Sequence, residues 1–154
     1  MLPQELNLKA FLKNTKEMVK IININFITEK ITYCKNIFDD SEQVACYKDF
    51  EADFKDVELI QCTNLKDKDN NFIYEGDIVQ AIVDLTGIVK NGRHTCGIKN
   101  TTHSGWYIEW IGYGSVQLFS NQLLPFIESN DGLKVVGNIY ENPELLRYFK
   151  KINS

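Results

Sequence analysis

Two carboxylates, Glu75 and Asp77, lie two positions apart in the stretch NFIYEGDIVQ at residues 71–80. On a strand these side chains share a face, and paired carboxylates divide acid and base roles when their environments separate their pKa values. No histidine, lysine or third acid adjoins them in the sequence. A turn is the favoured interpretation, because Gly76 tolerates backbone conformations that a Cβ resists and an aspartate such as Asp77 readily bonds backbone amides.

Side chains of metal-ligand type gather at His94, Cys96 and His103. A tetrahedral zinc site needs four ligands, commonly in closely spaced pairs, so a fourth ligand has to come from a distant part of the chain. A solvated hairpin is the favoured explanation, and we predict neither a metal nor a cofactor. A metal-dependent hydrolase that uses Glu75, Asp77 and His94 is therefore the weakest of the functional hypotheses.

The pattern Asp67-x-Asp69-x-Asn71 is similar to the start of a calcium-binding loop. That loop requires Gly at its sixth place and Glu at its twelfth. This chain has Phe72 and Ile78 there. The polar run at residues 64–71 is therefore predicted to be a surface turn, since Asn and Asp tolerate left-handed backbone and bond their own main chain.

Aromatic and basic side chains lie close together between residues 90 and 113, and bases stack well on aromatic rings framed by cations. The candidate nucleic-acid face consists of Lys90, Arg93, Trp106, Tyr107, Trp110 and Tyr113. The favoured alternative is that Trp106 and Trp110, which share a strand face, fill the hydrophobic core. A single-stranded nucleic-acid-binding module is the second functional hypothesis.

The bulk composition narrows the function classes. The chain has 17 Lys and Arg against 21 Asp and Glu, a net charge of −4, which disfavours binding of duplex DNA by the whole surface. The glycine patterns that bind phosphates are absent. No signal peptide and no apolar run of about 18 residues is present, so we predict a cytoplasmic protein with no membrane partner. Cys34, Cys46, Cys62 and Cys96 are expected to be free thiols.

Alternation of period two dominates the chain and predicts strands at residues 19–28, 30–34, 57–62, 78–83, 87–90, 93–99, 105–111, 116–119 and 133–140. In the first of these, Lys20, Ile22, Ile24 and Phe26 are expected to form the core face. Asn91-Gly92 is a strong hairpin-turn signal and predicts that residues 93–99 return along residues 87–90. Residues 3–13 are expected to form a strand, and residues 48–56 an exposed connection with some helix.

A short helix is predicted at the C-terminus. Asn142 suits the N-cap, Pro143 the first helical position and Glu144 the positive end of the helix dipole. With turns every 8–12 residues elsewhere, the pattern indicates a small barrel or sandwich.

Three stretches together resemble the YopX-like family, which occurs mainly in phages and prophages. They are TNLKDKDNNFIYEGDIV at residues 63–79, VVGNIYENPELL at residues 135–146 and, more loosely, KAFLKNTKEM at residues 9–18. Asn64 and Asn70 stand where the family usually has Gly, and Asn is the residue that best replaces Gly in left-handed backbone. Phe11 replaces the usual Trp, and Leu12 replaces the usual Asp.

The resemblance implies a β-rich fold with a barrel-like C-terminal half and assembly into oligomers. It brings no catalytic residues. The motif residues are interpreted as a structural turn and strand corner, and they are Tyr74, Glu75, Gly76, Asp77, Asn138, Tyr140, Asn142 and Pro143.

These observations predict a mainly β fold, α+β at most, with a small SH3-like open barrel in the C-terminal half. Residues 1–154 are expected to form a single domain, with additional N-terminal strands in residues 1–62, and the barrel and terminal helix in residues 63–154. The leading hypothesis is a non-enzymatic phage or prophage accessory protein in the cytoplasm of a bacterial host cell. It is expected to act as a homo-oligomer that binds an unknown phage or host protein. Residues 19–28 or the C-terminal helix are expected at the subunit contact.

Overall fold

The computed structural model describes residues 7–38, 44–81, 85–96, 100–111, 122–129 and 132–152. The chain is mainly β, as predicted, with two antiparallel sheets and few helices. It divides into two compact units, Met1–Gln61 and Cys62–Ser154. The expected boundary lay between Cys62 and Thr63; the assignment of the whole chain to a single domain stays a prediction.

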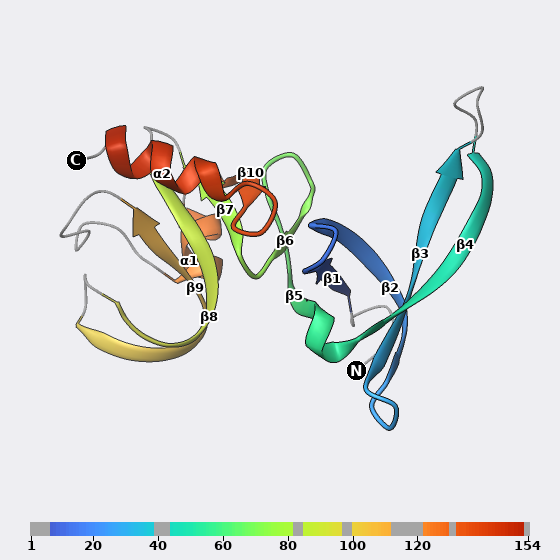
Figure 1. Cartoon of the computed structure of the whole chain (residues 1–154). Coiled ribbons are helices and arrows are strands. Elements are labelled where there is room, and N and C mark those ends of the chain that lie inside the picture. Colours follow the sequence, from blue (N-terminus) through green and yellow to red (C-terminus); the bar gives the residue numbers. More distant parts are fainter. Residues whose placement is uncertain are drawn as a thin grey trace. The chain divides into compact units, whose positions relative to one another are not determined.

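The first unit is a meander of antiparallel strands (Figure 1). Its elements are β1 (Leu8–Leu12), β2 (Glu17–Asn25), β3 (Lys30–Phe38), β4 (Val44–Asp53), a turn of 3-10 helix (Phe54–Asp56) and the start of β5 (Val57–Lys66). The strands are hydrogen-bonded in the order β4-β3-β2-β1-β5. The strand expected in residues 3–13 is present as β1. The core of this unit contains Ala10, Leu12, Val19, Ile31, Tyr33 and Val57.

The face of β2 that points to the core differs from the prediction. Val19 is buried and Ile21 and Ile24 pack against the core, whereas Ile22 is 54% exposed. The pairing of β2 with β3 shifts register between Ile21 and Asn23. A β-bulge adds one residue to a strand, so it exchanges the two faces on either side of it. The strict alternation of Lys20, Ile22, Ile24 and Phe26 was therefore the wrong pattern.

Strand β4 replaces the exposed connection that the sequence predicted for residues 48–56. Its pairing with β3 runs from Lys30↔Asp53 to Phe38↔Val44, and helical structure is limited to Phe54–Asp56. β4 is paired on one side only in the strand order, and its charged side chains Lys48, Asp49 and Glu51 are exposed. Edge strands commonly carry such charges, which makes them resemble loops in sequence.

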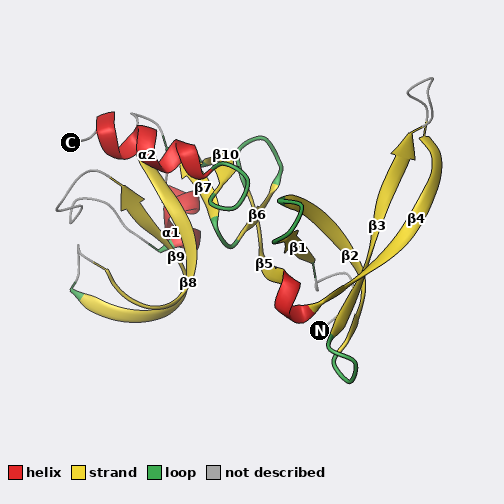
Figure 2. Cartoon of the chain, in the orientation of Figure 1, coloured by secondary structure: helices red, strands yellow, loops and turns green. Residues whose placement is uncertain are grey.

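The second unit contains the end of β5 and a four-stranded sheet (Figure 2). Cys62 and Lys66 of β5 pair with β6 (Phe72–Tyr74). The sheet has the order β10 (Lys134–Asn138), β7 (Asp77–Gln80), β8 (Thr86–Cys96) and β9 (Thr101–Ile111). The core residues of this unit are Ile73, Val79, Leu85, Val89, Ile108, Leu123, Phe126 and Leu133. The expected strand at residues 116–119 lies outside the described residues, and the SH3-like form of the barrel stays a prediction.

The hairpin predicted at Asn91-Gly92 is wrong. β8 continues through both residues to Cys96 and pairs along its whole length with β9, with Asn91 opposite Trp106 and Gly92 opposite Gly105. The two glycines have φ angles of 143° and 136°, which side chains rarely permit. The Asn-Gly pair therefore marks a backbone irregularity within a long two-stranded ribbon, where two glycines face each other.

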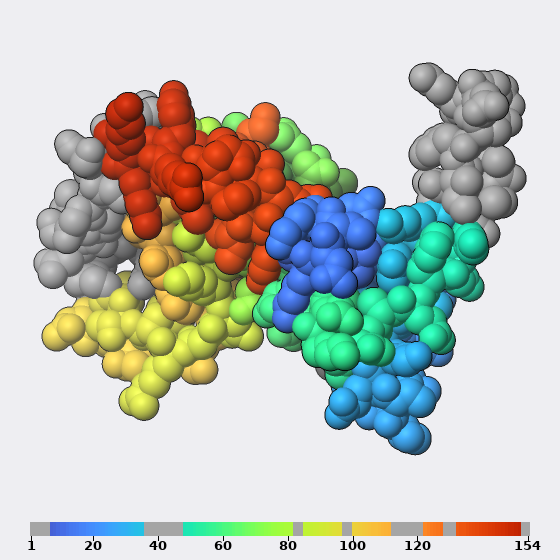
Figure 3. Space-filling model, in the orientation of Figure 1, coloured from blue at the N-terminus to red at the C-terminus, as the bar shows by residue number. Residues whose placement is uncertain are grey.

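The described part of the second unit contains two helices. The sequence did not predict α1 (Leu123–Ser129), which contains Pro125 in its first turn, where a missing N–H breaks no helical hydrogen bond. The predicted C-terminal helix is present as α2 (Pro143–Ile152), and Figure 3 shows it, in red, on the surface. Within the described ranges, no helix has the length and apolar character that a bilayer crossing requires.

Three of the cysteines are free thiols, as predicted. Cys62 and Cys96 are buried and Cys34 is half-buried. The side chain of Cys46 lies outside the described residues.

Candidate functional site

The corner between β6 and β7 is built on Asp77. Its side chain is 8% exposed, and its Oδ2 accepts a hydrogen bond from the amide of Tyr74 at 2.8 Å. A short acidic side chain that bonds a nearby main-chain amide fixes a tight turn. Glu75, two residues earlier, is half-buried. The Asp77 carboxylate therefore has a structural partner within its own turn.

Gly76 joins this corner to the C-terminal motif at residues 135–146. Its φ angle is +82°, and a Cβ there would lie 2.7 Å from the Tyr140 ring. The Gly76 amide donates to the Val89 carbonyl at 2.8 Å, and the Gly76 carbonyl accepts from the Ile139 amide at 2.9 Å. Only glycine meets both the conformational and the steric requirement at this position.

In the C-terminal motif, as at Asp77, side-chain oxygens accept hydrogen bonds from main-chain amides. Asn138 lies opposite Asp77, and its Oδ1 accepts hydrogen bonds from the amides of Tyr140 at 3.0 Å and Glu141 at 2.8 Å. Asn142, which precedes Pro143 at the start of α2, accepts from the Asn138 amide at 3.2 Å through its Oδ1. The amide side chains thus hold the turn that leads from β10 into α2.

Asp67 bonds more of the main chain than the surface turn predicted from the sequence requires. It is 6% exposed, and its Oδ1 accepts from the amides of Asp69 at 3.0 Å and Asn71 at 2.8 Å. Its Oδ2 accepts from the amide of Val135 at 3.1 Å. Burial raises the pKa of Asp67, but the hydrogen bonds from these three amides outweigh it and hold the pKa below its ordinary value. The turn was predictable, whereas the bond to β10 was not.

Asp67, Asp77, Asn138 and Asn142 therefore use side-chain oxygens to bond main-chain amides. Among the described residues, no group of three or more His, Cys, Asp or Glu side chains is placed to hold a metal ion. Two carboxylates need distinct environments and a reactant between them to share acid and base chemistry. The structure gives Asp77 an amide partner instead, and the assignment of the chain as a non-enzyme stays a prediction.

The candidate nucleic-acid residues lie on both faces of the β8–β9 ribbon. Trp106 and Trp110 pack against the core, and Trp110 lies 5.0 Å from Phe126 between ring centroids. Tyr107 and its register partner Lys90 alternate with the tryptophans and so occupy the other face. Lys90 forms an ion pair with Glu109, and Arg93 is exposed. Tyr113 lies outside the described residues. The structure does not bring this set together, and nucleic-acid binding stays a prediction.

A cavity of about 420 Å³ lies in the second unit, and we call it the Trp106 cavity. Its described apolar lining consists of Leu65, Trp106, Leu124 and Pro125. Its described polar lining consists of Thr63, His94, His103, Ser104 and Gln122. From the sequence, His94 and His103 were considered as metal ligands and Trp106 as part of the nucleic-acid face. No sequence pattern indicated that these three residues line one cavity with the start of α1.

His94 is the most unusual residue of this cavity. It is 9% exposed, its ring stacks on Tyr107 with centroids 4.5 Å apart, and its Nδ1 lies 3.2 Å from the Gly92 carbonyl oxygen. A carbonyl oxygen only accepts, so Nδ1 carries the hydrogen and, in the neutral ring, Nε2 is an acceptor. This Nε2 is buried and has no hydrogen-bond partner within the described structure. The ring centroid of His103 lies 6.0 Å away.

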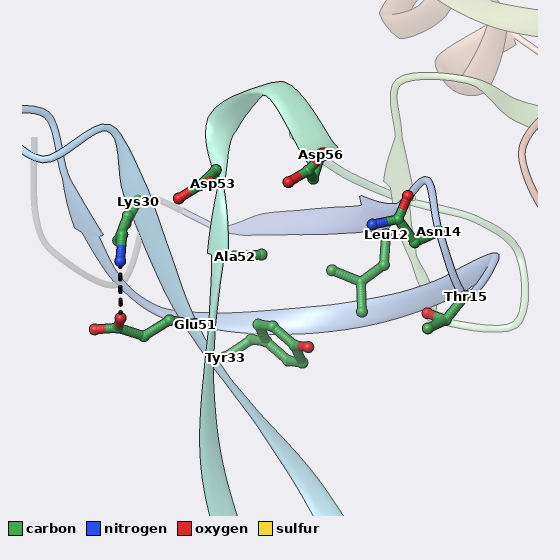
Figure 4. A pocket seen from close by; sticks show the side chains of 9 residues that line it. All are labelled: Leu12, Asn14, Thr15, Lys30, Tyr33, Glu51, Ala52, Asp53 and Asp56. Carbon is green, nitrogen blue, oxygen red and sulfur yellow. Dashed lines mark hydrogen bonds and ion pairs between the residues drawn. The ribbon is translucent and has the colours of Figure 1, made fainter.

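A second cavity, of about 250 Å³, lies in the first unit (Figure 4). Its lining includes the carboxylates of Glu51, Asp53 and Asp56. Glu51 forms an ion pair with Lys30 at 3.4 Å, drawn as the dashed line in Figure 4, and Asp53 lies 3.8 Å from Lys55. Two of the three acids therefore already have cationic partners, and the cavity offers no defined site for a cation.

The family model described as YopX protein matches residues 7–147. The crystal structure of protein EF1440 from Enterococcus faecalis is similar over 91% of this chain and 96% of that chain, with 20% sequence identity and a TM-score of 0.49. No curated protein matches the chain.

Proposed function

This chain belongs to the YopX family, and on that premise we propose that it is a non-enzymatic phage or prophage accessory protein. It acts by associating with copies of itself and by binding a phage or host protein. The proposal is supported by the corner residues, because Asp67, Asp77 and Asn138 direct their side-chain oxygens to main-chain amides. Side chains that bond main-chain amides stabilise turns, so we expect binding to involve other, exposed residues.

The observation that carries the proposal is the apolar tip of the β2–β3 hairpin. Phe26 and Ile27 lie in the turn and are 75% and 95% exposed, and Ile22, within β2, is 54% exposed. The turn projects from the sheet of its own unit (Figures 1 and 3). Exposed apolar side chains that cluster mark interaction surfaces more often than isolated ones do.

The turn presents these side chains in a defined conformation. The Asn25 Oδ1 accepts hydrogen bonds from the amides of Ile27 and Thr28, each at 3.0 Å, and Glu29 has a φ angle of 54°. The Phe26 ring makes an edge contact with Phe54 at 5.9 Å between centroids. An ordered apolar tip loses little conformational entropy when a partner covers it, which favours association.

Sedimentation velocity over a micromolar concentration series tests the proposal. The Ile27→Glu variant places a charge at the most exposed of these apolar positions, and Tyr148→Glu does the same on α2, where Tyr148 is 60% exposed. Burial of an isoleucine contributes about 1.5–3 kcal/mol, and 1.4 kcal/mol is tenfold in affinity. We expect wild type and Tyr148→Glu to self-associate alike, and Ile27→Glu to associate at least about tenfold more weakly.

Two results would change this picture. A wild-type chain that sediments as a monomer at every concentration contradicts self-association. Dissociation by Tyr148→Glu together with full assembly of Ile27→Glu moves the contact from the hairpin to α2, the other surface that the sequence suggested.

A further inference from the structure

We propose that the Trp106 cavity binds a small, uncharged, flat heteroaromatic molecule of the nucleobase or nucleoside class. The inference is independent of self-association, because every described lining residue belongs to the second unit. It also differs from nucleic-acid binding along an exposed strand face, since the ligand enters a cavity and is bound as a single base.

The size of the cavity limits how large the ligand can be. About 420 Å³ lies near the lower end of the range of small-molecule sites, which is roughly 300–1,000 Å³. Such a volume suits one or two rings with a few substituents.

The charge of the lining limits the charge that the ligand can carry. None of the nine described lining residues is Asp, Glu, Lys or Arg. A formal charge that moves from water into such a site loses its hydration without gaining an ionic partner. A neutral ligand is therefore preferred over a phosphorylated one.

The arrangement of polar groups among rings indicates the chemical class. The Trp106 indole and the imidazoles of His94 and His103 provide aromatic surface, and Ser104 adds a hydroxyl group. Flat rings are attracted to such surface by stacking. A nucleobase in addition carries hydrogen-bond donors and acceptors along its edge, so it satisfies both features of the lining at once.

Ser104 offers a hydrogen bond to a ligand. It is an exposed residue of the lining, and its hydroxyl group both donates and accepts. An exocyclic amino group, a ring N–H or a carbonyl of a base is a matching partner. The Nε2 of His94 is buried out of reach of a ligand, so His94 contributes its ring alone.

Tryptophan fluorescence offers a direct test because the chain has two tryptophans. Trp110 packs on Phe126 and does not line the cavity, so the Trp110→Phe variant leaves Trp106 as the only reporter. We titrate this variant with adenosine, guanosine, cytidine and uridine, each beside its 5′-monophosphate. The expected result is a saturable change with at least one nucleoside, and binding of its monophosphate that is no tighter.

One substitution and a matched control localise the site. Ser104→Phe fills an exposed position of the lining and removes its hydroxyl group. It is expected to weaken binding at least tenfold. Thr102→Phe adds the same ring at an exposed position of β9 outside the described lining and is expected to have no effect. Circular dichroism of each variant verifies the fold, and calorimetry on the wild-type chain replaces the fluorescence assay if Trp110→Phe does not fold.

Three results would overturn the inference. The first is the absence of saturable binding for all four nucleosides by fluorescence and calorimetry. The second is a monophosphate that binds tenfold tighter than its nucleoside, which identifies an anion site. The third is binding of a single-stranded oligonucleotide by a chain that binds no nucleoside, which identifies a polymer surface.

Discussion

The amide of Val135 donates a hydrogen bond to Asp67 Oδ2 at 3.1 Å across 68 positions of sequence. The same carboxylate accepts from Asp69 and Asn71 within its own turn. One buried side chain therefore joins the turn after β5 to strand β10. Because an acceptor shared by three amides leaves three donors unsatisfied when it is removed, Asp67 is a sensitive point of the second unit.

Replacement of Asp67 by alanine is expected to lower the free energy of unfolding by about 2–4 kcal/mol, because hydrogen bonds to a charged acceptor contribute more than neutral ones. Urea denaturation followed by circular dichroism measures the change. Asp69→Ala is the matched control, since the Asp69 side chain is exposed and forms a surface ion pair with Lys134 at 3.6 Å. An equal loss of stability in both variants contradicts the role of Asp67.

Acid is expected to remove the contribution of Asp67. Its pKa in the folded state lies below the ordinary value of 3.8, so its stabilising effect is complete above that value and is lost as the pH falls through the folded pKa. The stability difference between wild type and Asp67→Asn should be constant near neutral pH and shrink below about pH 4. Exposed Glu17, whose pKa is lowered chiefly by its hydrogen bond with Lys35, titrates equally in both proteins and cancels. A difference that grows in acid would contradict this assignment.

The two structural glycines should respond differently to alanine. Gly76→Ala combines backbone strain at φ +82° with a Cβ 2.7 Å from Tyr140, and it is expected to destabilise by about 2–5 kcal/mol. Gly92→Ala also has a positive φ, but apart from its chain neighbours no described residue has an atom within 4 Å of the added Cβ, so about 1–3 kcal/mol is expected. Thermal and urea unfolding compare the two. A larger effect at Gly92 would show that the contact with Tyr140 is unimportant.

Much of the fold could be predicted from the sequence because neighbouring residues determine it. Asn142, Pro143 and Glu144 predicted the start of α2, and the alternation in residues 30–34 predicted the first half of β3. These signals depend on neighbouring residues only. The turn at Gly76 belongs to the same class, since its positive φ follows from the residue type.

The errors share a physical cause, which is that distant strands decide the outcome. The bulge after Ile21 is set by pairing with β3, and Asn91-Gly92 is held in a strand because Trp106 and Gly105 of β9 lie opposite. The Trp106 cavity combines β5, β8, β9 and the start of α1, which no local pattern indicates. Tertiary context overrides turn propensity in such places.

Two buried threonines of the second unit provide opposite tests of polar burial. Thr86 is fully buried and its Oγ1 has no partner within the described structure, so Thr86→Val is expected to stabilise the chain by about 1–2 kcal/mol. Thr63 is also buried, but its Oγ1 donates to the Ile73 carbonyl at 2.8 Å and accepts from the Leu65 amide at 3.1 Å. Thr63→Val is expected to destabilise by about 1–3 kcal/mol. Equal signs for both variants in urea titrations would refute this contrast.

Photo-crosslinking at the hairpin tip tests the proposed self-association most directly. Benzoylphenylalanine replaces Phe26, which is 75% exposed, and in a control chain it replaces Tyr148 on α2. After irradiation, mass spectrometry of isotopically mixed chains identifies bonds between copies. We predict that the probe at position 26 reacts with β2 or β3 of a second copy and that the probe at position 148 does not. Exclusively intramolecular products from position 26, at concentrations where the chain self-associates, would contradict the account.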